Sequence, residues 1–331
     1  MRDVHYTSAT AADAAVARRA AATAPSTRYL GGGTTLFDLM KLNVEAPAAL
    51  IDVTRCDDLR GIEAGRAAWR LGAGTTMSEV AGHEAVRREF PALSESLWKA
   101  ASQQIRNMAT LGGNLLQRTR CAYFRGTPAY PCNKREPGTG CSALEGADRG
   151  HALFGGSAHC IATYPGDLAV ALVAFDAEVD VRSPSGARSL PLSALHKDPG
   201  DTPHLDTVLA DDELIVAIRI PRVPAMRASV YHKVRDRESY AFALTSAAVG
   251  LQVEGNRVVD VRIGLGGVAT RPWRAPQAEA HLRGRVLTRQ SARQAAELAF
   301  ADARPRGHNR FKVALGIDTL VDALLQSKER L

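Results

Sequence analysis

The spacing of apolar and polar residues predicts a first two-thirds that mixes helices with short strands. Residues 48–53 predict a buried strand, and residues 61–73 predict a hairpin with its turn near Gly65. The runs at 77–88 and 92–104 have helical spacing. An irregular, glycine- and proline-rich stretch from 118 to about 163 follows. Loops of this length are uncommon inside a compact domain unless they are functional or held in place.

Regular structure resumes with a predicted helix at 167–174 and a strand at 212–221. After Pro224 the pattern changes to three alternating strands, the last two joined across Gly255 and Asn256. The chain then ends in two or three predicted helices, at about 274–284, 289–302 and 309–327. Strands followed by helices are typical of an α+β domain. We therefore expect a domain boundary near residues 222–227.

Composition and charge exclude several classes of protein. The chain has 331 residues, 23% of them charged, and a net charge of +7. It lacks a Lys/Arg-rich run and a recognition motif, so we expect no nucleic-acid partner. No stretch approaches about 18 consecutive apolar residues, so we expect no membrane span. Two arginines stand near the N-terminus where a signal peptide needs an apolar run, so we expect no export signal in this chain.

Two glycine-rich segments are candidates for binding a phosphate. One is YLGGGTTL at 29–36, and the other is ATLGGNLLQ at 109–117, with AGTT at 73–76 as a third segment. Bare backbone after a strand lets a ligand approach closely and leaves N–H groups to cradle a phosphate. Neither segment has the spacing of a dinucleotide fingerprint or a Walker A loop. By themselves both segments are equally compatible with tight structural turns.

Four of the five cysteines fall within one window: Cys121, Cys132, Cys141 and Cys160. Zinc sites usually contain close cysteine pairs, which this window lacks. Four thiolates also hold [4Fe–4S] clusters, and wide spacing is acceptable when a long loop wraps around the cluster. Basic residues in the same region would offset the negative charge of such a cluster: Arg106, Arg118, Arg120, Arg125, Lys134 and Arg135. The fifth, Cys56, we interpret as structural, and His159 as a packing or solvent-facing residue.

The ordered motifs LGGGTTL, LIDVTR, GAGTT, IRNMATLGGNLLQ and YPGDLAVAL resemble the FAD-binding subunits of the xanthine dehydrogenase and molybdenum hydroxylase family. The resemblance extends through YHKVRDRESYAFAL to nearly the whole chain. It implies an α+β protein with an FAD-binding domain at 1–224, built from two α/β subdomains of the vanillyl-alcohol-oxidase (PCMH) type at about 1–55 and 56–224. A CO-dehydrogenase-flavoprotein-like domain with a three-stranded antiparallel sheet and helices would follow at 225–331.

The resemblance also implies which residues contact FAD, with the pyrophosphate between the loops at 30–36 and 110–114. Lys233 would lie near the flavin ring, where a cation stabilises the anionic reduced form. Thr35 replaces an acidic residue common in the family, which matters little if backbone groups hold the phosphates. The expected contacts are Arg28, Leu30, Gly31, Gly32, Gly33, Thr34, Thr35, Leu36, Thr75, Thr110, Gly113, Asn114, Asp167, Ile215 and Lys233.

The cysteine window resembles the branch of this family whose flavin subunit carries a [4Fe–4S] loop, here at 118–163. CAYFRGTPAYPCNKREPGTGC, followed by the HC at 159–160, is similar to the bacterial three-subunit, periplasmic type of aldehyde oxidoreductase. This implies Cys121, Cys132, Cys141 and Cys160 as cluster ligands. It also implies two partners, a [2Fe–2S] small subunit and a molybdenum-cofactor large subunit. The alternatives are the beta subunit of a 4-hydroxybenzoyl-CoA reductase, or a xanthine-dehydrogenase-like subunit.

On this interpretation the chain transfers electrons from molybdenum, through iron–sulfur centres and FAD, to an external acceptor. We expect no residue in it to act on the aldehyde, because that site lies in another subunit. The cellular location of the chain would depend on its partners. We expect it in the periplasm if a signal-bearing partner exports the complex, and in the cytoplasm otherwise. The alternative from another class is a zinc-stabilised, non-enzymatic binding module.

Overall fold

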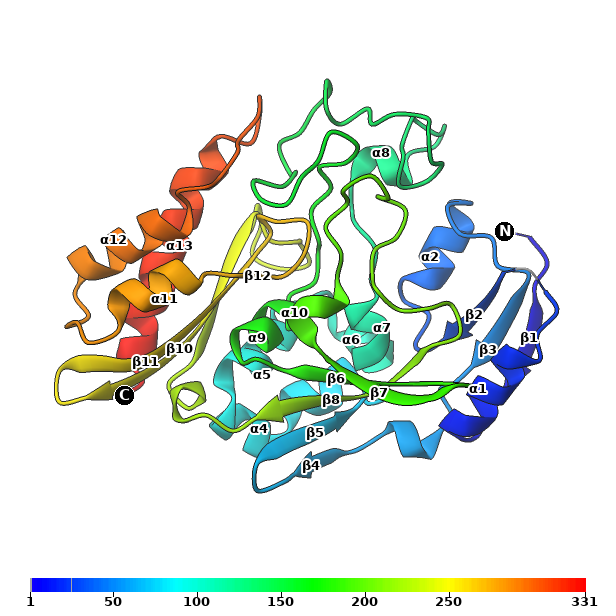
Figure 1. Ribbon diagram of the computed structural model, residues 1–331, viewed down its shortest axis with the longest axis horizontal. Helices are drawn as coiled ribbons and strands as arrows, with labels where there is room; N and C mark the ends of the chain where they lie inside the picture. The colour runs from blue at the N-terminus through cyan, green and yellow to red at the C-terminus, as the bar shows by residue number, and fades with distance from the viewer. Residues whose placement is uncertain (1, 25) are drawn as a thin grey trace.

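The computed structural model describes residues 2–24 and 26–331 and contains three sheets (Figure 1). The N-terminal sheet is parallel, in the order β1 (His5–Ser8), β3 (Ala49–Asp52) and β2 (Thr27–Leu30). Helices α1 (Ala12–Ala20) and α2 (Leu36–Lys41) connect these strands. All four residues of β3 are buried, as expected for the central strand of a covered parallel sheet.

The second sheet has five antiparallel strands and forms the centre of the molecule. Its order is β4 (Ile62–Ala64), β5 (Ala68–Gly72), β8 (Leu214–Pro221), β6 (Glu178–Ser183) and β7 (Gly186–Pro191). Strands β4 and β5 pair in antiparallel register, so the hairpin predicted at 61–73 is confirmed. The sheet therefore joins strands separated by more than a hundred residues of chain.

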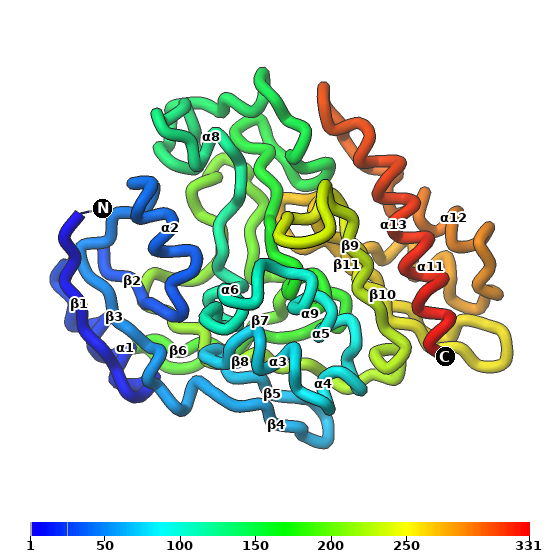
Figure 2. The backbone as a smooth tube through the Cα atoms, turned by 180° about the vertical axis from the view of Figure 1, so that it is seen from behind, coloured from blue at the N-terminus to red at the C-terminus, as the bar shows by residue number. Residues whose placement is uncertain are grey.

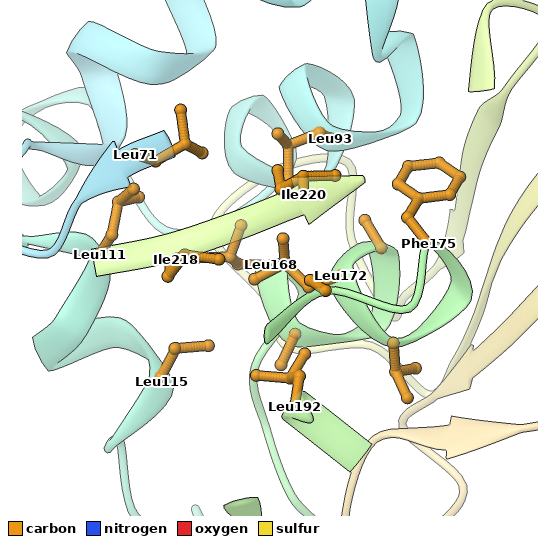
Figure 3. Packing of buried hydrophobic residues seen from close by; sticks show 14 of the residues in the cluster. Leu71, Leu93, Leu111, Leu115, Leu168, Leu172, Phe175, Leu192, Ile218 and Ile220 are labelled. Atoms are coloured by element: carbon orange, nitrogen blue, oxygen red, sulfur yellow. The ribbon is translucent and has the colours of Figure 1, made fainter. Parts of the chain in front are cut away.

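Six helices pack close to this sheet. They are α3 (Met77–Gly82), α4 (Glu84–Glu89), α5 (Pro91–Trp98), α6 (Gln103–Met108), α7 (Leu111–Leu115) and α9 (Leu168–Ala174). Figure 3 shows Leu93, Leu111, Leu168 and Ile218 meeting in the apolar core between them. Every residue of α9 is buried. A helix that is apolar on all sides belongs in the middle of a core.

The two helices predicted at 77–88 and 92–104 are each broken in the structure. His83 ends α3 and caps α4, its Nδ1 accepting the Val86 N–H at 3.4 Å. Ala101 has a positive φ of 49°, which ends the helical path after α5. Ser102 then caps α6. Helical periodicity continued through both breaks because the apolar positions on either side face the same core.

The stretch at 118–163 is irregular, as predicted, with one short helix, α8 (Ala122–Arg125). Figures 1 and 2 both place it as a cap near α2 and the C-terminal part of the chain. A further short helix, α10 (Leu192–Leu195), follows β7. Two 3-10 turns complete this part, at Asp57–Leu59 and Pro224–Met226.

The C-terminal part contains one antiparallel sheet covered by helices. Its order is β12 (Trp273–Arg274), β11 (Arg257–Gly266), β10 (Thr245–Glu254) and β9 (Val230–Val234). The expected three-stranded sheet therefore has a fourth strand. We missed β12 because it has two residues, too few for alternation to appear. The covering helices are α11 (Pro276–Leu282), α12 (Arg289–Ala299) and α13 (Phe311–Lys328).

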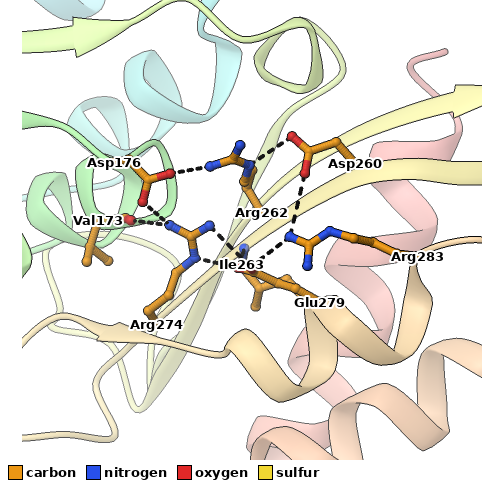
Figure 4. Close-up of polar contacts among 8 residues, drawn as sticks. All are labelled: Val173, Asp176, Asp260, Arg262, Ile263, Arg274, Glu279 and Arg283. Atoms are coloured by element: carbon orange, nitrogen blue, oxygen red, sulfur yellow. Dashed lines mark hydrogen bonds and ion pairs between the residues drawn. The ribbon is translucent and has the colours of Figure 1, made fainter.

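Charged residues join this sheet to α9, as Figure 4 shows. Arg274 on β12 donates to Asp176 at 2.6 Å and to the Val173 carbonyl at 2.9 Å. It also pairs with Glu279 of α11, which accepts the Ile263 N–H at 2.8 Å. A single guanidinium thus connects three elements. Within residues 2–24 and 26–331, no helix has the length and apolar character needed to cross a membrane.

Candidate functional site

The glycine loop after β2 lies directly against the segment that links α6 to α7. A Cβ added to Gly31 would stand 2.7 Å from Thr110 Oγ1, and one added to Gly32 would stand 1.7 Å from the Met108 carbonyl oxygen. Gly33 has a φ of +71°. The absence of side chains is therefore what lets the two loops meet. The resemblance predicted these two loops as neighbours, and the fold brings them together.

The two loops open onto a cleft of about 310 Å³, which lies in the size range of small-molecule sites. One side of the cleft is formed by residues expected at FAD: Arg28, Leu30, Gly31, Gly32, Gly33, Thr34, Thr35, Leu36, Thr110 and Gly113. Thr110 caps α7 and its hydroxyl accepts the Gly113 N–H at 3.3 Å. This side of the cleft combines bare backbone, hydroxyls and the Arg28 cation, a chemistry that suits a pyrophosphate. Arg28 also lies 3.8 Å from Glu45 and 3.6 Å from Asp211, two acids that line the same cleft.

The other expected FAD contacts lie outside the wall of this cleft. Thr75 is buried and exchanges hydrogen bonds with the backbone of Gly61, at 3.1 and 3.3 Å. The Asn114 amide donates to the sulfur of Met77 at 3.3 Å, and Ile215 is buried on β8 opposite Val181. Of these, Thr75 also contacts the second loop, its carbonyl accepting the Leu111 N–H at 3.0 Å.

Asp167 and Lys233 also lie away from the cleft wall and contact each other. Lys233 Nζ is 2.7 Å from Asp167 Oδ2, between β9 and the start of α9. The resemblance placed both residues near the cofactor, Lys233 at the flavin ring. The ion pair provides a structural role for both that needs no ligand.

The far side of the cleft is formed by residues from His204 to Glu213, most of them before the strand predicted at 212–221 and outside any predicted element. Arg118 enters the cleft from the end of the second glycine motif. It forms ion pairs with Glu45 at 2.6 Å and with Asp206 at 2.7 Å. Arg118 was expected only to balance a cluster. Asp206 could not be found from sequence, because it lies in a segment without periodicity.

The four clustered cysteines line one small cavity in the cap, although up to 39 positions of the chain separate them. Cys132 and Cys141 lie opposite each other in an isolated antiparallel bridge. All are free thiols. Tyr123, Phe124 and His151 also line this cavity. A set of four thiols around one enclosed space is the donor set that an iron–sulfur cluster requires.

Burial dominates the chemistry of these thiols. It raises the pKa of Cys121 to about 11, although the Phe124 and Tyr123 N–H groups act in the opposite direction. Burial also raises the pKa of Cys160, partly offset by the Lys134 cation. Thiolates here therefore need a positive partner, which a bound metal provides.

Within the described residues, no three His, Cys, Asp or Glu side chains are placed to hold a single metal ion. Four ligands of one zinc ion must converge on one point at about 2.3 Å. A cluster instead offers a separate iron to each thiolate, so its ligands stand farther apart. His159 is half-exposed and lies 3.3 Å from Asp201. The histidine at the cavity is His151, whose Nε2 is 3.3 Å from Cys121 Sγ.

The basic residues around the cysteines are partly neutralised by acids from elsewhere. Arg120 and Arg125 both pair with Asp38 of α2. Only one of the six residues expected to offset a cluster, Lys134, lines the cysteine cavity. The fold therefore brings three acids, Asp38, Glu45 and Asp206, to these six cations and offsets about half of their charge.

Cys56 is buried and its thiol donates to the Ala9 carbonyl at 3.4 Å, so it is structural as expected.

Comparisons with known proteins agree with this geometry. Residues 2–223 match the family model described as the FAD binding domain in molybdopterin dehydrogenase. Residues 229–327 match the model of the CO dehydrogenase flavoprotein C-terminal domain. The structure is similar to carbon monoxide dehydrogenase from Hydrogenophaga pseudoflava, with a TM-score of 0.77 and 25% identity over 99% of this chain and 98% of the other.

Two curated relatives also match over most of their own length and most of this chain. The aldehyde oxidoreductase FAD-binding subunit PaoB of Escherichia coli (strain K12) is 46% identical, over 92% of each chain. The glyceraldehyde dehydrogenase medium chain of Sulfolobus acidocaldarius is 25% identical, over 86% of this chain and 83% of the relative. The chain therefore belongs to the family of FAD-binding subunits of molybdenum hydroxylases and is a subunit of an oxidoreductase.

Proposed function

We propose that this chain is the electron-transfer subunit of a heterotrimeric, molybdenum-containing aldehyde oxidoreductase, with FAD in the cleft and a [4Fe–4S] cluster in the cysteine cavity. The observation that carries the proposal is the convergence of four thiols on one cavity of a family member. The relative with an aldehyde oxidoreductase name is 46% identical, against 26% and 24% for those named after carbon monoxide and xanthine.

The loops at 30–36 and 110–114 would hold the pyrophosphate of FAD, and Arg28 would face its charge. Bound there, FAD supplies two-electron redox chemistry, and an external acceptor would reoxidise it. The protein's residues position and enclose the cofactor, and none is assigned to the aldehyde. We place the domain that binds FAD at 1–224 and the C-terminal domain at 225–331.

The four cysteines would ligate the cluster, with Lys134 facing its negative charge from the cavity wall. All four thiols line one cavity, and a [4Fe–4S] cluster offers one iron to each of four thiolates. A [2Fe–2S] small subunit and a molybdenum-cofactor large subunit would complete the enzyme. The substrate would be oxidised in the large subunit, aldehyde and water giving carboxylate, three protons and two electrons.

The test is metal and flavin analysis of the purified complex with Cys132→Ser. Iron should fall by about four atoms per complex, while flavin stays at the wild-type ratio. Cys56→Ser, outside the cavity, is the control and should keep all the iron. Unchanged iron in Cys132→Ser would refute the cluster assignment. A colourless, zinc-containing preparation without iron or flavin would support the binding module instead.

Substrate class is tested separately. The wild-type complex should reduce an artificial acceptor with aromatic and aliphatic aldehydes, and much more slowly with carbon monoxide or xanthine. Faster turnover of either of the last two would reject the aldehyde assignment and leave the subunit role intact.

A further inference from the structure

The cleft and the cysteine cavity share a wall. Arg118 and Asp206 line the cleft, and Lys134 lines the cysteine cavity. A third, small cavity lies between them, lined by both Lys134 and Asp206. The two sites are therefore separated by a few side chains, and these carry charge.

The charged residues in this wall form a continuous chain centred on Asp206. Its Oδ1 accepts the Lys134 ammonium at 2.6 Å, and its Oδ2 accepts Arg118 Nε at 2.7 Å. Lys134 also donates to the Pro203 carbonyl at 2.5 Å. Arg118 continues the chain to Glu45 at 2.6 Å. One carboxylate thus contacts a cation from each site.

The environment of Asp206 favours its ionised form. Burial acts to raise the pKa of Asp206, but Lys134 and Arg118 together hold that pKa below its usual range. Lys134 is buried, and the Arg118 side chain is 18% exposed. The Arg118 guanidinium also lies over the ring of Phe124, 4.7 Å from its centroid, and Phe124 lines the cysteine cavity. The Asp206 side chain is 32% exposed, and charges in such a partly buried wall act at longer range than charges in water.

We propose that Asp206 is a positioning residue that couples the two redox sites, its carboxylate setting the reduction potentials of both the cluster and the flavin. This rests on the function proposed above. The wall carries two cations, Lys134 and Arg118, and two anions, Asp206 and Glu45, and is neutral as a unit. Reduction adds negative charge to either centre, so removing the carboxylate favours reduction at both.

The experiment is redox titration of the assembled complex, following flavin absorbance and the cluster's electron paramagnetic resonance. Asp206→Asn, nearly isosteric, leaves the wall one charge more positive and should shift both potentials upward. Lys134→Met leaves it one charge more negative and should shift the cluster potential downward. The double variant restores neutrality, so its cluster potential should return toward wild type.

Shifts of opposite sign in the two single variants would show an electrostatic effect. Structural damage at the wall would not be expected to shift the potentials in opposite directions in the two variants. Asp302→Asn, an exposed carboxylate in the C-terminal part, is the control and should shift neither potential. If Asp206→Asn loses iron, Asp206→Glu keeps the charge and should keep both wild-type potentials. The cluster potential of the double variant must then still lie closer to the wild-type potential than that of Lys134→Met does.

Unshifted potentials, or shifts of one sign in both single variants, would overturn the coupling when iron and flavin are at wild-type levels. Those results would leave the proposed function standing. Absence of iron from the wild-type complex would instead overturn the cluster itself. Iron and flavin content measured on every variant keeps the two failures apart.

Discussion

Lys233 and Asp167 form a buried ion pair, with Nζ 2.7 Å from Oδ2 and side chains that are 1% and 5% exposed. Lys233 also donates to the Lys99 carbonyl at 3.0 Å. The other oxygen of Asp167 accepts the Tyr231 hydroxyl at 2.5 Å. The pair joins the C-terminal sheet to the helix at the centre of the first domain. The closeness of Lys233 to the flavin ring remains a prediction.

Replacing Lys233 with Met should destabilise the protein by about 3–5 kcal/mol, because the Asp167 carboxylate would stay buried without its cation. Chemical unfolding of the isolated chain measures this cost. Lys41→Met, at an exposed position, should cost little. The double variant Lys233→Met with Asp167→Asn should recover part of the loss. Equal stability of Lys233→Met and wild type would contradict the role of the pair.

Gly32→Ala should abolish flavin retention. Its Cβ would stand 1.7 Å from the Met108 carbonyl oxygen, and backbone cannot rotate away as a side chain can. The two glycine loops would then separate. The flavin-to-protein absorbance ratio of the purified complex is the measurement.

Gly82→Ala provides the matched control, because an added Cβ there meets nothing within 4 Å at the end of α3. It should keep flavin and gain slightly in stability, since Ala is the better helix residue. Full flavin in Gly32→Ala would show that the loops do not need to touch.

His196 should make the fold sensitive to mild acid. Burial lowers the pKa of His196 to about 4, and its Nε2 lies 2.9 Å from the Leu115 carbonyl oxygen. In the unfolded chain the same group binds a proton below about pH 6.5. The unfolded state therefore holds more protons between pH 6.5 and 4, and stability falls as pH falls through that window.

The slope from this one group is at most about 1.4 kcal/mol per pH unit. His196→Gln, whose amide donates to the same carbonyl, should lack that part of the slope. Unfolding curves at pH 7, 6, 5 and 4.5 measure it, with His5→Gln, exposed, as the control. Identical slopes in wild type and His196→Gln would disprove the assignment.

Arg274→Met should loosen the contact between α9 and the C-terminal sheet. Asp176, the Val173 carbonyl and Glu279 would each lose one donor, although Arg262 would still pair with Asp176. We expect a loss of up to about 3 kcal/mol, below the full cost of an orphaned buried charge because Arg283 still lies 3.5 Å from Glu279.

Arg274→Lys should recover only part of this loss, since an ammonium cannot reproduce the fork of a guanidinium. Arg293→Met, in exposed pairs with Glu297 and Asp318, should cost much less than Arg274→Met. Thermal unfolding compares the three variants. Equal losses in Arg274→Met and Arg293→Met would show that the network is only a surface feature.

The sequence by itself determined the glycine loops, the elements with strong periodicity, the irregular cap and the family. These depend on local backbone freedom and on spacing that repeats along the chain, so Gly31 to Gly33 and the hairpin at 61–73 could be recognised without a fold. The breaks at His83 and Ala101 were missed because side-chain periodicity does not record a change of backbone direction.

Only the tertiary structure decided which charges meet. Asp206 lies in a segment without pattern, and its partners Arg118 and Lys134 are 88 and 72 positions away. The sequence predicted that Arg120 and Arg125 offset the charge of a cluster, whereas in the structure both pair with Asp38. Ion pairs between such distant residues depend on the distance between the charges in the folded chain and on the solvation they lose there. Neither quantity can be obtained from the order of residues alone.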